Sequence, residues 1–161
     1  MSDHQEKREH NEIVAFIKTY IGRKPDDFAP PFTRWLDGEM VSVCEGEIVM
    51  KFVVREEMTN PTGLLHGGMH AAMMDDIIGM TVLTLVEKGV ALTVDLHVDY
   101  LGRVEKGDVV YAYCRVERNG RKIINAMCEL RDKNGTTISK GSSNLVKTGY
   151  AKPFSEDETG K

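Results

Sequence analysis

The most regular hydrophobic pattern in the chain is an alternation that runs from Leu92 to Tyr100. Apolar side chains occupy every second position, and the positions between them hold Thr93, Asp95, His97 and Asp99. A period of two is typical of a strand that buries one face. We therefore expect a strand here, with its apolar side against the core.

Shorter strand patterns occur elsewhere, over residues 40–54, 109–117, 122–131 and in a last stretch that ends near Val146. Glu45-Gly46 divides the first of these into two strands. Asn119-Gly120 and Asn134-Gly135 mark the later turns, because Asn-Gly between alternating runs is a strong hairpin signal. These patterns predict two strands before residue 60 and a four-stranded antiparallel meander after residue 91.

One long apolar stretch, residues 69–86, separates the two groups of strands. Its apolar side chains fall on nearly every face of a helix, which is typical of a helix surrounded by protein. Pro and Gly punctuate the loop before it, and Gly89 is expected to end it. The pattern predicts an α+β fold in which an antiparallel sheet is wrapped around one long central helix.

The two ends of the chain lie outside this arrangement. Residues 9–21 place apolar side chains at helical spacing and predict a short amphipathic helix. Residues 28–37, which contain prolines and the only Trp, are expected to form an ordered loop. The predicted organisation is an N-terminal helix and loop over residues 1–37, one domain over residues 38–149 and a disordered tail over residues 150–161.

Composition narrows the classes of function. A net charge of −4 and a pI near 5.7 argue against a broad nucleic-acid surface, which needs clustered Lys and Arg. No stretch reaches the roughly 18 consecutive apolar residues of a membrane helix, and the charged start does not resemble a signal peptide, so we expect a cytoplasmic protein. Cys44, Cys114 and Cys128 have no metal-binding spacing and are expected to be reduced, mostly buried thiols.

Asp75 and Asp76 lie in the middle of the predicted apolar helix, where an unpaired carboxylate is costly to bury. Helical geometry gives Asp75 small neighbours, including Gly79 one turn later, so Asp75 is expected to face open space. Asp76 has bulky neighbours instead. Asp75 is therefore the candidate catalytic residue, and the alternative is a structural aspartate that accepts hydrogen bonds from a neighbouring strand.

His66-Gly67-Gly68 lies where this helix begins, and the unsatisfied N–H groups of a helix start favour negative charge. Two glycines let a ligand approach the backbone, so the turn can hold a carbonyl oxygen and stabilise the oxyanion formed on attack. The alternative is a tight turn that only glycine permits. For His66, and more so for His70 and His97, a structural role is favoured over metal ligation, and no metal site is predicted.

Asn60, Gly63, His66-Gly67-Gly68 and Asp75, nine positions after His66, resemble the motif of the PaaI-type hotdog thioesterases. The resemblance extends from about Gly38 to Gly149, and the predicted helix and strands fit the hotdog topology. It implies an enzyme that hydrolyses small acyl-CoA or aryl-acyl-CoA thioesters to the free acid and CoA.

The resemblance also implies roles for single residues. Asp75 would act as nucleophile or as general base toward water on the thioester carbon. Gly67 would offer its backbone N–H to the carbonyl oxygen, beside Gly68, and His66 would help to place the thioester. Asn60 would orient the substrate or the attacking water.

Thr93 occupies a position where related enzymes often have Ser or Thr near that water, and its alternative is a plain strand threonine. In this family Asp75 would act across a dimer interface, facing the His66 loop of a second copy. A homo-oligomer is therefore expected, either a dimer or a tetramer built as a dimer of dimers.

Coenzyme A enters as part of the substrate, so no cofactor is expected, and neither nucleic acid nor a membrane is an expected partner. Arg121 and Lys122 flank the predicted hairpin turn, and the Arg121 position resembles the family's basic turn. They would hold the CoA phosphates, and the alternative is that both are ordinary solvated charges.

Two other functions remain as alternatives. A hotdog dehydratase or hydratase pairs a His with an acid in other motifs, which this sequence does not contain. A non-catalytic acyl-CoA-binding or sensing module would keep the pocket and the basic residues without turnover, although no DNA-binding extension is found. Release of thiol from acyl-CoAs distinguishes hydrolysis from both.

Overall fold

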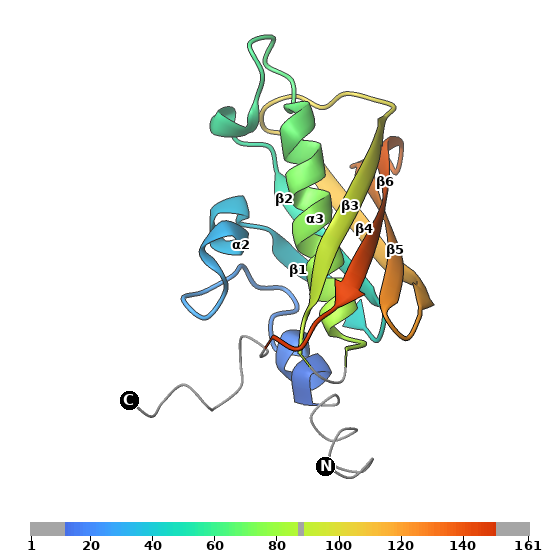
Figure 1. Cartoon of the computed structure of the whole chain (residues 1–161). Helices are drawn as coiled ribbons and strands as arrows, with labels where there is room; N and C mark the ends of the chain where they lie inside the picture. The colour runs from blue at the N-terminus through green and yellow to red at the C-terminus, as the bar shows by residue number, and fades with distance from the viewer. Residues whose placement is uncertain (1–11, 87–88, 151–161) are drawn as a thin grey trace.

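A six-stranded antiparallel sheet curls around one long helix, as Figure 1 shows in the computed structural model, which describes residues 12–86 and 89–150. The spatial order of the strands is β1-β2-β4-β5-β6-β3. Their bounds are β1 (Glu39–Cys44), β2 (Glu47–Val53), β3 (Ala91–Tyr100), β4 (Val109–Asn119), β5 (Ile123–Asp132) and β6 (Thr137–Lys147). The predicted α+β fold, with the sheet wrapped around one helix, is confirmed.

The central helix α3 (Gly67–Leu83) packs against β2, β3, β4, β5 and β6. The expectation that it continues to residue 86 is wrong, because its last turn is capped at Thr84. The Thr84 hydroxyl donates to the Thr81 carbonyl at 2.6 Å and accepts from the Gly46 N–H at 2.8 Å. The Thr84 side chain thus binds the Thr81 carbonyl, which the N–H of residue 85 would bind in a continuing helix, and the helix stops before Gly89.

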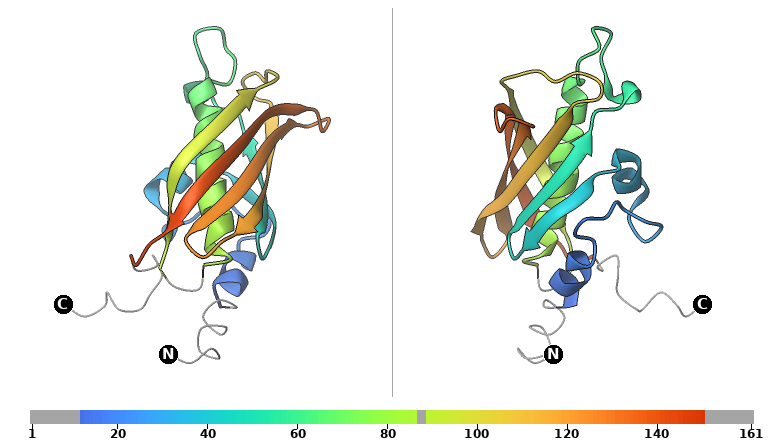
Figure 2. Two further views of the ribbon diagram at one scale, coloured as in Figure 1. Left: turned by 45° about the vertical axis from the view of Figure 1, so that its right-hand side comes forward. Right: turned by 180° about the vertical axis from the view of Figure 1, so that it is seen from behind.

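The expected four-stranded meander is wrong in one strand. β4, β5 and β6 follow one another as predicted, but β3 pairs with β6, and β4 pairs with β2. The connection over residues 101–108 therefore crosses the N-terminal end of α3, at the top of both views in Figure 2. It is held there by Leu65, whose N–H donates to the Val104 carbonyl at 2.9 Å. β3 is left as an edge strand.

A bulge between Thr93 and Asp95 changes which side chains of β3 point toward α3. Thr93 pairs with Leu145 and Leu96 pairs with Ser143, and both partners are buried on the helix side of the sheet. Residues three apart would lie on opposite faces of a regular strand, so the extra residue in the bulge turns Thr93 toward α3.

Only part of the apolar face of β3 lies against the core as expected: Leu96 and Val98 are half-buried and pack against it. No β3 side chain is buried, and Leu92 and Val94 are 45% and 60% exposed. The strand exists where the alternation predicted it, but its edge position and its bulge leave Leu92 and Val94 without cover from this chain.

The described N-terminal residues, from residue 12 onward, contact β1 through a bridge between Ile21 and Met40 and contact α3 through the Thr33–Asp76 hydrogen bond. Residues 12–18 are helical, within the predicted helix over residues 9–21, whose first residues lie outside the described part of the chain. The loop expected over residues 28–37 instead contains helix α2 (Pro31–Leu36). Pro31 is tolerated there because the first helical position has no intrahelical use for an N–H. The predicted tail lies outside the described residues from 151 onward.

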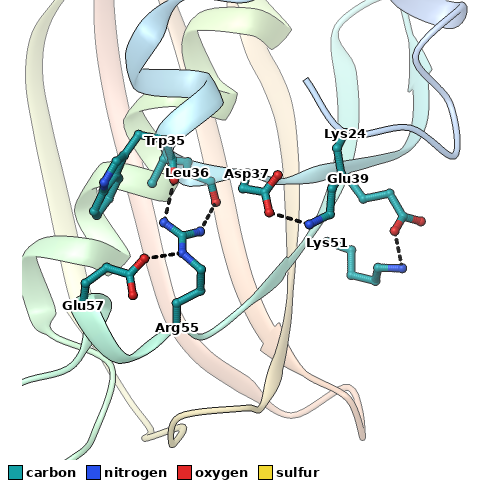
Figure 3. Close-up of polar contacts among 8 residues, drawn as sticks. All are labelled: Lys24, Trp35, Leu36, Asp37, Glu39, Lys51, Arg55 and Glu57. Atoms are coloured by element: carbon teal, nitrogen blue, oxygen red, sulfur yellow. Dashed lines mark hydrogen bonds and ion pairs between the residues drawn. The ribbon is translucent and has the colours of Figure 1, made fainter. Parts of the chain in front are cut away.

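The end of α2 is fastened to the strand domain by Arg55, which lies between β2 and the short 3₁₀ helix η1 (Glu56–Met58) (Figure 3). Its guanidinium donates to the Leu36 carbonyl at 3.0 Å and to the Trp35 carbonyl at 2.6 Å. It also stacks over the Trp35 ring, 5.1 Å from the centroid. A second tie joins Lys24 to Asp37, which follows α2. These contacts hold the N-terminal segment against the sheet.

The cysteines are free thiols, as expected. Cys114 and Cys128 face one another across β4 and β5 and are buried, whereas Cys44 is exposed. Among the described helices, none has the length and hydropathy needed to cross a lipid bilayer.

The two neighbouring isoleucines of β5 test the assignment of the sheet faces. Ile124 points to α3 and is 0% exposed, whereas Ile123 points outward and is 38% exposed. Ile124→Ala should lower the free energy of unfolding by about 2–5 kcal/mol, because it leaves a cavity in the core. Ile123→Ala should cost less than about 1 kcal/mol. Urea denaturation of both variants at equal protein concentration measures the difference, and equal losses would contradict the assigned register.

Candidate active site

Asp75 lies on the side of α3 that faces β3. Its side chain is exposed, and the Thr93 hydroxyl donates a hydrogen bond of 2.9 Å to its Oδ1. The bulge in β3 makes this contact, because it turns Thr93 to the helix side of the sheet. A structural aspartate would also accept such a bond. The exposed side chain of Asp75 also borders open space, which a purely structural carboxylate does not need.

Asp76, the next residue, is held from the other side of α3. The hydroxyl of Thr33 in α2 donates to Asp76 Oδ1 at 2.7 Å, while Asp76 Oδ2 is buried and has no hydrogen-bond partner among the described residues. Burial raises the pKa of Asp76, the Thr33 hydrogen bond opposes this rise, and the negative charge of Asp75 adds to it. The two adjacent carboxyl groups therefore have different environments.

Both carboxyl groups line one cavity of about 390 Å³. Its walls are α3, the start of β3 and the N-terminal segment, and most of the lining is apolar. Asp75 faces open space as helix geometry predicted. The cavity also reaches Asp76, which that geometry had placed among bulky neighbours, because α2 covers this side of the helix without filling it.

The start of α3 presents one backbone donor. The His66 side chain caps the helix, and its Nδ1 accepts the Gly68 N–H at 2.9 Å. His66 O accepts from the N–H groups of Met69 and His70. Within the described part of the chain, the Gly67 N–H is left without an acceptor. It can therefore bind an oxygen atom of a ligand.

The His66 ring can contribute a second donor. Because Nδ1 accepts from Gly68, the neutral ring carries its proton on Nε2, which is then free to donate. The Gly68 N–H is already used in this cap. A Cβ atom at Gly68 would lie 3.1 Å from His66 Nδ1, so a side chain there would push the His66 ring away from its capping position by a few tenths of an ångström.

Asn60 organises the loop before α3. Its side-chain oxygen accepts hydrogen bonds from the Thr62 N–H, the Thr62 hydroxyl and the Leu64 N–H, at 2.6–3.2 Å. The oxygen is thus engaged within the loop, which leaves the amide nitrogen as the group that can reach a substrate. The loop in turn positions His66, whose N–H donates to the Met58 carbonyl at 2.9 Å.

The structure brings Asp75 and Thr93 together but separates them from the His66 turn. Gly67 and Asp75 are eight residues apart on one straight helix, which corresponds to roughly 12 Å along its axis. Arg121 and Lys122 are exposed in the turn between β4 and β5. This turn lies at the other end of the sheet from the start of α3 (Figure 1). Within one chain, the predicted site residues therefore form three separate groups.

His70 and Thr33 are two further residues near the site whose roles the sequence showed less clearly or not at all. His70 is structural, as favoured: it is buried, and its Nδ1 lies 2.9 Å from the Ser139 hydroxyl. Over residues 12–86 and 89–150, no three metal-binding side chains converge. Thr33 was missed as a neighbour of Asp76, because 43 positions separate them and no local pattern links α2 to α3.

The raised pKa of Asp76 gives a prediction for stability. A carboxyl group whose folded pKa lies above its unfolded value of 3.8 favours folding in its protonated form, so its contribution declines as pH rises toward the folded pKa. Asp76→Asn mimics the protonated form and still accepts from Thr33. The variant should match the parent near pH 3.8 and become increasingly more stable than the parent at higher pH. Urea unfolding across this range measures the difference, and a parent that is more stable at pH 8 would contradict the prediction.

Known proteins resemble this chain in sequence and in fold. The family model of the thioesterase superfamily matches residues 62–139, which include the His66 turn, Asp75 and Thr93. Human acyl-coenzyme A thioesterase 13 is 28% identical over 103 residues, which cover 63% of this chain and 74% of the human protein.

Two solved structures share the fold. Zebrafish thioesterase superfamily member 2 superposes with a TM-score of 0.71 at 28% identity, over 84% of this chain and 96% of the zebrafish chain. The Streptococcus mutans protein smu.793, solved bound to acetyl-CoA, superposes with a TM-score of 0.67 at 23% identity, over 71% of this chain and 91% of that chain. The chain belongs to the thioesterase superfamily and is a PaaI-type hotdog enzyme that hydrolyses thioesters.

Proposed function

We propose that the protein hydrolyses acyl-CoA thioesters and that Asp75 is its catalytic carboxylate. The observation that carries this proposal is the position of Asp75, which borders an apolar cavity and is oriented by Thr93. A carboxylate at the mouth of such a cavity can act on a thioester whose acyl part is buried beyond it. The name of the human relative supports CoA as the thiol.

In the proposed reaction, Asp75 takes a proton from water as the water oxygen bonds to the thioester carbon, or its own oxygen bonds to that carbon first. The carbonyl electrons move to oxygen and then return as the carbon–sulfur bond breaks. In the first route the CoA thiolate leaves and takes up the proton that Asp75 removed from water. In the second route the thiolate leaves first, water then cleaves the anhydride formed with Asp75, and a proton of this water goes to the thiolate. Both routes consume one water molecule and give a carboxylic acid and CoA.

The oxyanion that forms needs donors at hydrogen-bond distance, and the Gly67 N–H and His66 Nε2 are suited to this role. A donor and an attacking group on the same carbonyl lie within roughly 6–7 Å of one another, since each is about 3 Å from its atom. Gly67 and Asp75 of one chain are about 12 Å apart along α3. A complete site therefore needs Asp75 from one chain and the His66 turn from another.

The exposed edge of β3 offers a surface for this second chain. Ten residues of unpaired strand edge with exposed Leu92, Val94 and Tyr100 favour pairing with another copy. The proposed assembly is a dimer, with a tetramer as a dimer of such dimers. Light scattering at micromolar concentration measures the assembly, and a monomer would contradict both the dimer and the shared site.

The CoA phosphates are proposed to bind Arg121 and Lys122, whose side chains are exposed at the turn between β4 and β5. A contact remote from the carbonyl contributes equally to substrate and transition-state binding. Arg121→Ala should therefore raise KM for an acyl-CoA and leave kcat within about twofold. An unchanged KM would remove Arg121 from the site.

Asp75→Asn tests the catalytic assignment. The amide can still accept from Thr93 but can neither attack nor take a proton, so kcat should fall by roughly 10²–10⁴-fold while the fold is retained. The matched control is Asp76→Asn, which should lose less than about tenfold, because Asp76 is bound to Thr33 and not positioned by β3. CoA release, followed with a thiol reagent, measures both. An inactive Asp76→Asn with an active Asp75→Asn would refute the assignment, and binding without turnover by the parent would favour a sensor.

Subunit complementation tests the shared site. Gly67→Pro removes the proposed oxyanion donor and should preserve the helix, because proline suits the first helical position and His66 already has the extended backbone that proline requires. Asp75→Asn and Gly67→Pro homodimers should both be nearly inactive. A purified heterodimer of the two contains one intact site and one doubly impaired site, so it should regain about half of the parent activity. An inactive heterodimer would place each site within one chain.

A further inference from the structure

The cavity beside Asp75 has a wall that the family match does not include. On one side it is lined by a stripe of α3 that runs from Asp75 and Asp76 through Gly79 and Met80 to Leu83. On the other side it is lined by residues of the N-terminal segment, including Phe16, Ile17, Tyr20, Phe28, Ala29 and Phe32. The family model begins at residue 62, so this second wall belongs to the part of the chain outside the match.

Gly79 keeps the α3 side of the cavity open. A Cβ atom built at Gly79 would meet no atom within 4 Å, so a side chain would extend into empty space and not into protein. Glycine inside a helix costs roughly 1 kcal/mol relative to alanine. No positive φ or close approach requires glycine at this position. What Gly79 provides is volume, one helical turn beyond Asp75.

The dimensions of the cavity indicate the size of its ligand. Leu83 lies eight positions after Asp75, which is roughly 12 Å along the helix. An extended alkyl chain advances about 1.3 Å per carbon–carbon bond, so this length matches roughly nine or ten carbons. The volume of 390 Å³ is consistent with such a chain, because an apolar cavity of about 150 Å³ already admits one benzene molecule.

The N-terminal wall is fixed before any ligand binds. Thr33 is bonded to Asp76 across the cavity, and Arg55 holds the last carbonyls of α2. At the other end, the Gly22 N–H donates to the Met40 carbonyl at 2.8 Å and the Met40 N–H donates to the Arg23 carbonyl at 3.1 Å. A wall fastened at both ends can select a ligand by size, because it does not have to be ordered on binding.

We propose that residues 12–38 and the open groove at Gly79 form the acyl-chain chamber of the enzyme, and that its substrates carry apolar acyl groups of roughly eight to twelve carbons. The proposal rests on the thioesterase function above and specifies its substrate class. The thioester carbonyl lies at Asp75 and the chain extends along α3 toward Leu83, between the helix and the N-terminal segment.

The parent enzyme tests the length limit. Along the series from butyryl- to decanoyl-CoA, kcat/KM should rise by up to roughly fourfold for each added methylene, the factor that corresponds to burial of one such group. It should stop rising between octanoyl- and dodecanoyl-CoA, where the chamber is filled. Higher kcat/KM for acetyl- or phenylacetyl-CoA than for decanoyl-CoA would overturn the proposal.

Variants on both walls test the location. Gly79→Leu fills the groove from α3, and Ala29→Leu narrows it from the N-terminal segment. Each should lower the ratio of kcat/KM for decanoyl-CoA to that for butyryl-CoA by at least about tenfold. Gly79→Ala, which adds one methyl group, should change this ratio less than Gly79→Leu. Leu83→Ala should move the preferred length upward by lengthening the chamber. Ile123→Ala, on the outer face of β5, should leave the ratio unchanged.

The outcomes separate this inference from the proposed function. If the parent releases no CoA from any acyl-CoA, the proposed function fails. If the parent is active but Gly79→Leu and Ala29→Leu lower kcat/KM equally for all chain lengths, the function stands and the chamber is refuted. If only Gly79→Leu changes the ratio, the N-terminal segment is not the opposing wall, and this also refutes the proposal.

Discussion

The structure depends on how one apolar helix is enclosed. The sheet curls around α3 and packs against it through five of its strands, so most of the helix surface is buried. A carboxyl group on such a helix is tolerated only where the sheet leaves an opening or where another group supplies hydrogen bonds. Asp75 and Asp76 occupy this opening, with Thr93 on one side and Thr33 on the other. The position of the site follows from this constraint.

The edge strand β3 links the site to the proposed assembly. Its bulge turns Thr93 toward Asp75, and the same irregularity leaves Leu92 and Val94 exposed. A regular strand would have aligned its apolar side chains against the core, as the alternation suggested. The strand instead orients the carboxylate with its inner side and presents an apolar edge outward. In the proposed dimer, both properties serve one site, because the second chain brings the His66 turn that the first chain holds about 12 Å away along α3.

The N-terminal segment has a different role from the domain that it covers. The domain supplies the sheet, the carboxylate and the capped helix start, and the last two lie within the residues that the family model matches. Residues 12–38 supply the outer wall of the cavity and are fastened by the contacts of Thr33, Arg55 and Met40. In the proposed enzyme, the domain carries out the chemistry and the N-terminal segment limits the size of the substrate. Such a division allows the selected acyl group to change while the reacting groups keep their geometry.

The sequence by itself determined the class of fold, the positions of the strands, the central helix and the motif from His66 to Asp75, because periodicity and turn chemistry are local properties. The sizes of their neighbours on the helix also indicated that Asp75, and not Asp76, faces open space. Tertiary structure alone decided that β3 joins β6, that Thr33 binds Asp76 and that α2 stands where a loop was expected. The sequence also showed no sign of the bulge at Thr93, since apolar and polar residues alternate regularly through it. These features depend on which distant segments meet, and pairing between distant segments is not encoded in the spacing of neighbouring residues.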